Sequence, residues 1–182
     1  FAKVGYTFAG WALSSTGGVV HTDSKEVVSL TSEDDKVIEL FAVWTEHEYV
    51  VVFNGNNATS GSMQNQEYNY SETKALLENE FAKTGYTFLG WSTNKEATEA
   101  TYVDQQEVSM LTSENNGEVT LYAIWQANTY TIKFDGNGAT SGTMANQTRT
   151  YDDNAVLTKN TFVKTGYTFE GWSLVNNGKV TY

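Results

Sequence analysis

Hydrophobic and polar residues alternate over short stretches of this chain. In residues 130–134, Tyr, Ile and Phe occupy every second position, with Thr and Lys between them. This period of two predicts a half-buried strand, because successive side chains of a strand point to opposite faces. Residues 49–53 repeat the inward positions with Tyr, Val and Phe. An Asn-Gly or Asp-Gly pair follows each stretch and predicts a turn, with second strands near residues 64–70 and 146–151.

Helical patterns follow these strands. Ser71 suits the N-cap of residues 72–79, which are rich in good helix formers. Asp23 and Asp104 each precede a Glu by three residues, which resembles a capping box, although the apolar residues beyond fit a helix or a strand. The expected module is a small α+β unit with a hairpin, a short helix, an aromatic strand, an irregular segment and a closing strand.

One aromatic motif recurs along the chain. The signature Gly-Tyr-Thr-Phe-x-Gly-Trp stands at residues 5–11, 85–91 and 166–172, with offsets of 80 and 81. A second motif, Leu-Phe-Ala-Val-Trp at residues 40–44, matches Leu-Tyr-Ala-Ile-Trp at residues 121–125. Recurrence at a near-constant spacing indicates a tandem array, an architecture typical of scaffolds, spacers and binding surfaces.

The repeats divide the chain into three parts. Residues 49–125 form one complete unit, residues 1–44 the C-terminal part of a unit, and residues 130–182 the N-terminal part of another. Four residues separate consecutive parts. Both partial units are expected to expose unpaired strand edges, and contacts with another chain are expected there.

The signature suggests its own structural roles. Its variable position is Ala9, Leu89 or Glu170, so this position is expected to face solvent. The two glycines are expected to supply a backbone conformation or a close approach that a side chain would block. The closing tryptophan is expected to cover the edge of the core.

Composition and charge narrow the function classes. The 182 residues carry a net charge of −11, which argues against nucleic acid or an anionic membrane as a partner. No apolar run approaches 18 residues, so no membrane insertion is expected in this segment, and no leader is visible at the start. The absence of cysteine excludes a disulfide framework.

Several candidate sites have a simpler structural interpretation. The Trp and Tyr residues could stack on sugars, but their repeat-equivalent positions favour core packing. The Asn- and Gly-rich loops at residues 54–61 and 135–142 could bind a cation, but they lack the acidic spacing of a calcium loop and predict turns. The acidic residues 33–35 and 96–99 are expected to be solvated.

No catalytic pattern emerges. His21 and His47 are isolated, and no zinc spacing, nucleophile elbow or phosphate-binding glycine loop is present in the sequence. We therefore expect no enzyme, no catalytic, cofactor-binding or metal-ligating residue and no cofactor, and we assign no ligand-binding residue.

The combined motifs resemble the Listeria–Bacteroides repeat, which is related to the B-repeat of internalin B. The signature, the closing Leu-Tyr-Ala-x-Trp and the following Tyr-x-x-x-Phe-(Asn/Asp)-Gly-Asn carry this resemblance over the whole chain. It implies tandem β-grasp, ubiquitin-like modules on a large extracellular bacterial surface protein, often in long arrays, with no catalytic residues. Lys-Thr replaces the proline-containing approach often seen before the signature, and we expect no change of fold from this.

Two functions follow as hypotheses. The first is a structural and interaction segment, a stalk or spacer on the bacterial cell surface whose partners are proteins of host or neighbouring cells or other repeats. The second is a glycan- or peptide-binding module that uses exposed aromatic residues or a sheet edge.

Overall fold

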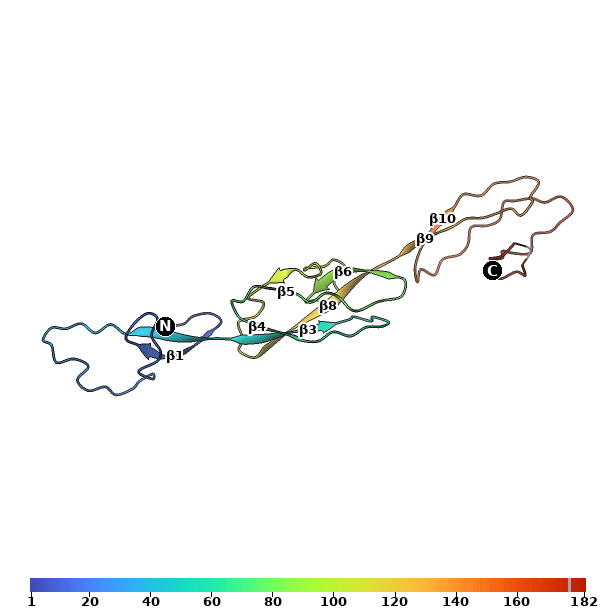
Figure 1. The fold of residues 1–182 in the computed structure, drawn as a ribbon. Helices are drawn as coiled ribbons and strands as arrows, with labels where there is room; N and C mark the ends of the chain where they lie inside the picture. Colours follow the sequence, from blue (N-terminus) through green and yellow to red (C-terminus); the bar gives the residue numbers. More distant parts are fainter. Residues whose placement is uncertain (177) are drawn as a thin grey trace. The chain divides into compact units, whose positions relative to one another are not determined.

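The computed structural model describes residues 1–176 and 178–182 (Figure 1). These residues group into two compact bodies: Phe1–Thr84 with Phe88–Gln126, and Gly85–Thr87 with Ala127–Tyr182. The strands are β1 (Tyr6–Ala12), β2 (Phe41–Glu46), β3 (Glu48–Asn54), β4 (Gln66–Asn69), β5 (Lys74–Ala75), β6 (Tyr86–Ser92), β7 (Glu107–Val108), β8 (Gly117–Ala127), β9 (Thr129–Ile132) and β10 (Gln147–Thr150).

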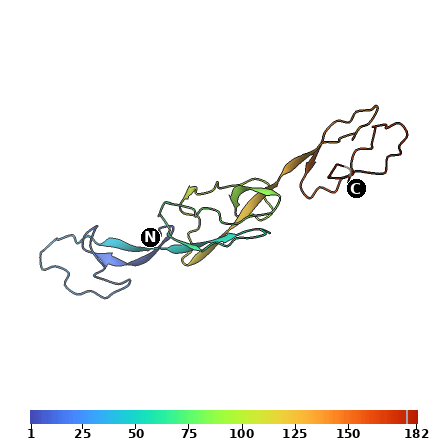
Figure 2. The same ribbon diagram turned by 45° about the vertical axis from the view of Figure 1, so that its right-hand side comes forward.

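The complete repeat is built on a four-stranded sheet with the order β4-β3-β8-β6 (Figure 2). β3 pairs antiparallel with β4 across the predicted turn and parallel with β8, where Phe53 lies opposite Leu121. Tyr49, Val51 and Phe53 are buried, whereas the residues between them are partly exposed. The predicted alternation is therefore confirmed for this strand.

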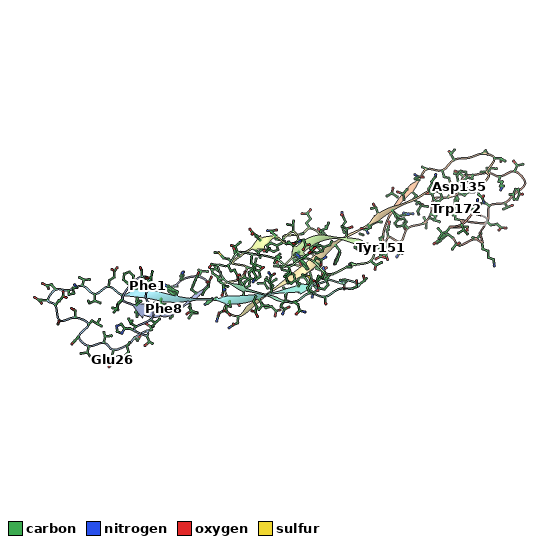
Figure 3. The ribbon with its side chains drawn as sticks, viewed as in Figure 1. Phe1, Phe8, Glu26, Asp135, Tyr151 and Trp172 are labelled. Carbon is green, nitrogen blue, oxygen red and sulfur yellow. The ribbon has the colours of Figure 1, made fainter. Side chains whose placement is uncertain are left out.

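An aromatic cluster fills the core beneath the sheet. Trp91 is fully buried, and its ring centroid lies 4.9 Å from Phe53 and 5.0 Å from Phe88. In the second body, Trp172 lies 4.8 Å from Phe134, beside the segment of Asp135 (Figure 3). Core packing is thus confirmed for Trp91, which stands in the middle of the core rather than at its edge.

The predicted helix over residues 72–79 is wrong. This segment is extended and contributes β5, which pairs antiparallel with β7. The side chain of Gln66 donates from Nε2 to the Ala75 carbonyl at 2.8 Å and accepts from the Leu77 N–H at 3.2 Å. These tertiary hydrogen bonds and the burial of Leu76, 2% exposed, outweigh a helix propensity of a few tenths of a kcal/mol per residue.

The capping-box pattern did not start a helix either. The Asp104 carboxylate accepts from the distant Asn79 N–H at 3.0 Å, and Gln105 adopts a φ of +56°, which interrupts a right-handed helix. Ser24, after Asp23, has the same φ. The described residues contain strands and no helix, so the α+β class is wrong and the chain is all-β there. The β-grasp assignment, which requires a helix against the sheet, is corrected with it.

The other two repeats form smaller sheets. β1 pairs antiparallel with β2, with a bulge between Phe8 and Gly10, and β10 pairs antiparallel with β9. Residues 13–40 run as an irregular loop, and Glu26 points away from it into solvent (Figure 3).

Candidate functional site

Consecutive repeats are joined by almost continuous strand. His47 is the single residue between β2 and β3, and Asn128 is the single residue between β8 and β9. The linkers that the sequence delimits at four residues are therefore mostly strand rather than loop.

His47 connects three parts of the first body. Its N–H donates to the carbonyl of Gly5 at 2.9 Å, and its own carbonyl accepts from the Tyr70 N–H at 2.8 Å. Its Nδ1 lies 2.7 Å from the carbonyl of Ser113, which can only accept, so this nitrogen donates. Nε2 lies 2.8 Å from the hydroxyl of Thr7. Hydrogen bonds from both the backbone and the side chain of His47 thus fix the connection between β2 and β3.

Asn128 makes the corresponding contacts in the second body. Its N–H donates to the carbonyl of Gly85 and its carbonyl accepts from the Tyr151 N–H, both at 2.8 Å. Its side-chain oxygen accepts from the Thr87 hydroxyl at 2.7 Å. Histidine and asparagine therefore fill one position of the same hydrogen-bonded arrangement.

The first glycine of the signature makes room for a tyrosine ring. Gly5 has a φ of +74°, and a Cβ placed on it would lie less than 3.0 Å from the ring of Tyr70. Gly85 has a φ of +77° and the same relation to Tyr151, which Figure 3 labels. Gly166 has a φ of +83°, yet nothing lies within 4 Å of a Cβ placed there. The expected close approach is confirmed for Gly5 and Gly85.

The tyrosine that follows this glycine forms the second wall of the contact. The rings of Tyr6 and Tyr70 meet edge to face with centroids 6.0 Å apart, and those of Tyr86 and Tyr151 do so at 5.8 Å. Lys3 Nζ lies 3.6 Å from the centroid of the Tyr6 ring. Each aromatic pair contributes about 0.5–1.5 kcal/mol beyond the area it buries. We call the signature Gly-Tyr the socket, and Tyr70-Ser71 or Tyr151-Asp152 the tyrosine turn.

A carboxylate accepts from the socket hydroxyl in both places. The Tyr6 hydroxyl lies 3.4 Å from Glu46 Oε1 and also 3.4 Å from the Ser71 hydroxyl oxygen, of which the carboxylate is the stronger acceptor. Glu46 Oε1 also accepts from the N–H of Ser71 at 2.6 Å and from its hydroxyl. The hydrogen bonds from Ser71 lower the pKa of Glu46. The Tyr86 hydroxyl donates to Asp152 Oδ2 at 3.1 Å, and this bond raises the pKa of Tyr86 because it favours the neutral phenol.

The candidate cation loops are turns. The side-chain oxygen of Asn54 accepts from the Asn56 N–H at 2.9 Å, and that of Asp135 accepts from the Asn137 N–H at 2.8 Å. These Asx turns confirm the turn interpretation. Within the described ranges, no group of three or more His, Cys, Asp or Glu residues is placed to hold a metal ion.

The other polar candidates do not come together. The acidic residues 33–35 are exposed, as are Glu96 and Glu99, so the solvated interpretation is confirmed. His21 lies opposite Trp11 in an isolated bridge, and His47 lies in the strand connection.

One open depression lies on the complete repeat. It has a volume of about 430 Å³, and its lining is mainly polar, with two aromatic residues. Its lining includes Asn54, Asn56, Lys95, Glu96, Tyr122 and Trp125. The indole N–H of Trp125 donates to the Gly55 carbonyl at 2.9 Å, which fixes the ring at the wall.

Sequence reasoning missed the tyrosine turn. Ser71 suggested a helix N-cap, whereas its N–H and hydroxyl donate to Glu46. The available signal was the recurrence of Tyr70 at Tyr151, 81 residues later, together with a small polar or acidic residue after each.

Comparisons with known proteins give one family. The Listeria-Bacteroides repeat domain matches residues 1–34, 49–124 and 130–182. A predicted Gly-rich membrane protein of Evansella cellulosilytica is 30% identical over 176 residues, 94% of this chain and 19% of that protein. A predicted membrane protein of the same organism is 30% identical over 178 residues, 97% of this chain and 24% of that protein. No solved structure matches.

The chain thus spans about a fifth to a quarter of the length of these curated relatives. A search of the described residues finds no helix with the length and apolar character needed to cross a membrane.

Proposed function

Because the chain belongs to the Listeria–Bacteroides repeat family, we propose that it is a structural repeat segment of a large bacterial surface protein, in which it serves as a stalk or spacer. The family is one of structural repeats. The names of the two relatives as membrane proteins, and their much greater length, support a position at the cell envelope, on its outer side.

The socket contact carries this proposal. A flexible tether between modules would need no recurring side-chain contact beside it, because an unstructured linker gains reach from its length alone. Here the connection at His47 is a single residue between two strands, and the ring of Tyr70 fills the space above Gly5. Such contacts restrict the bending of the chain where one repeat meets the next, which is what a spacer under load requires.

Adhesion is the extension of this role. Residues 49–125 carry a net charge of −7 and residues 130–182 one of +1, so surface charge changes while the aromatic core recurs. Variable surfaces on a constant core suit repeats that contact proteins of host or neighbouring cells.

Small-angle scattering tests the spacer role. Chains with two, four and six copies of residues 49–129 should show a maximum dimension that grows in proportion to copy number. Growth with the square root of copy number, as in a freely jointed chain, would overturn the proposal.

A glycan-binding role is the second candidate, and the depression lined by Tyr122 and Trp125 favours it. A glycan array probed with the chain tests this role, with Trp125→Ala as the matched variant. Absence of binding by the unaltered chain would reject it.

A further inference from the structure

Both tyrosine turns meet a socket, but the carboxylate at the contact comes from opposite sides. At the first socket it belongs to Glu46, at the end of β2, and the turn contributes the neutral Ser71. At the second socket the turn contributes Asp152. The position equivalent to Glu46 there is Ala127, which is 81 residues later and cannot be charged.

One carboxylate for each contact is what the chemistry of the socket tyrosine requires. Its hydroxyl offers one proton and is satisfied by one strong acceptor. A second carboxylate within hydrogen-bonding distance would repel the first, and its absence would leave the hydroxyl with a weaker partner.

We propose that the pairs Glu46–Ser71 and Ala127–Asp152 are pairing determinants, which let each socket accept the tyrosine turn that follows it and discriminate against the turn of the other repeat. The partner recognised is a repeat unit of the same family, identified by the residue after its turn tyrosine. This inference rests on the proposed function, since pairing matters only where repeats form an ordered array.

Exchanging the turns shows how discrimination arises. The first socket with the second turn would place Glu46 against an aspartate at the position of Ser71, whose hydroxyl now donates to that carboxylate. The second socket with the first turn would hold Ala127 and a serine, and Tyr86 would lose its carboxylate acceptor. Both mismatches weaken the contact, one by repulsion and the other by loss of a charge-assisted hydrogen bond.

Amide hydrogen exchange on the full chain tests this inference. The Tyr70 N–H, bonded to the His47 carbonyl, reports opening of the first contact, and the Leu76 N–H, bonded to the Gln106 carbonyl, reports the integrity of the repeat itself. Three variants of the two determinant residues are compared: Ser71→Asp, its neutral isostere Ser71→Asn, and the double variant Glu46→Ala/Ser71→Asp. The double variant gives the first contact the alanine and aspartate that the second contact has.

We expect Ser71→Asp to accelerate exchange at the reporting tyrosine amide by about tenfold, the effect of like charges and lost charge-assisted hydrogen bonds at a half-exposed site. Ser71→Asn should accelerate it by no more than about threefold, and the double variant should return within about threefold of the unaltered chain. Exchange at Leu76 should stay unchanged in all three.

The outcomes separate the two proposals. If the Tyr70 amide of the unaltered chain exchanges as fast as in an unstructured peptide, the repeats are uncoupled and the spacer role fails together with the pairing. If the Tyr70 amide of the unaltered chain is protected, two results would overturn the pairing inference alone. In the first, this amide exchanges at the same rate in Ser71→Asp and Ser71→Asn. In the second, it exchanges as fast in the double variant as in Ser71→Asp.

Discussion

A methyl group at the first signature glycine should open the contact with the tyrosine turn. At Gly5 an alanine would have to adopt a φ near +74°, which costs about 1–2 kcal/mol for a non-glycine residue. Its Cβ would also lie within 3.0 Å of the Tyr70 ring, and overpacking of this kind costs about 1–3 kcal/mol. Gly5→Ala should therefore destabilise the contact by about 2–5 kcal/mol.

The chain contains a matched control for the backbone strain. Gly166 stands in the same sequence context with a φ of +83°, and nothing lies within 4 Å of its added Cβ. Gly166→Ala therefore introduces strain without a clash. It should cost only the strain of about 1–2 kcal/mol, read from the exchange of the Tyr167 N–H, which donates to the Lys164 carbonyl beside it.

Removing the ring isolates the clash. In a Tyr70→Ala background, Gly5→Ala should cost only the strain of about 1–2 kcal/mol, so the double-mutant cycle should give a coupling energy of about 1–3 kcal/mol. The observable is the His47 amide, whose N–H donates to the Gly5 carbonyl. A coupling energy near zero would refute the socket, because it would mean that the glycine serves only its own turn.

Three further predictions concern the complete repeat. Trp91→Ala should cost about 3–5 kcal/mol in thermal unfolding, because it empties the centre of the aromatic core, and an exposed Leu89→Ala should cost less than about 1 kcal/mol. Gln66→Leu should cost about 1–3 kcal/mol in urea unfolding, because it removes two part-buried hydrogen bonds, one to the Ala75 carbonyl and one from the Leu77 N–H, and a neutral effect would contradict that role. Burial raises the pKa of Tyr68 to about 12 from the ordinary tyrosine value of 10.0. The stability that the buried neutral phenol contributes is therefore fully present below pH 10 and is lost as the pH rises from 10 to 12. Alkaline unfolding of Tyr68→Phe should show a shallower pH dependence over this window, and an unchanged slope would assign the loss to other tyrosines.

The strands were predictable because their signal is local. The alternation from Tyr49 to Phe53 and the Asn-Gly pair after it together predict a strand and a turn, and both are present. The recurrence of the signature also predicted that its tryptophan packs in the core, and Trp91 is fully buried there.

The helix was mispredicted because its competitor is distant in sequence. Residues 72–79 have good helix propensity, but a hydrogen bond from Gln66 to Ala75 and pairing of β5 with β7 satisfy the same backbone groups in an extended form. Propensity measures a local preference, and a single buried leucine such as Leu76 contributes about 1.5–3 kcal/mol by burial alone. The local sequence pattern of residues 72–79 carries no information about Gln66 or β7, which bond to this segment only in the folded chain.

The contact at the tyrosine turn shows why recurrence must be compared between sites rather than within one. Gly5 and Gly85 recur identically and read as turn glycines, whereas the residues that complete their contacts change from Glu46 and Ser71 to Ala127 and Asp152. No single position preserves the carboxylate, so a search for recurring acidic residues passes over it. What recurs is a total of one carboxylate in each pair of positions. The two positions of a pair lie about 25 residues apart in sequence and meet only in the folded chain. A feature of this kind follows from the physical requirement of one acceptor for one phenolic proton, and it becomes visible only when the structure shows which two positions share that proton.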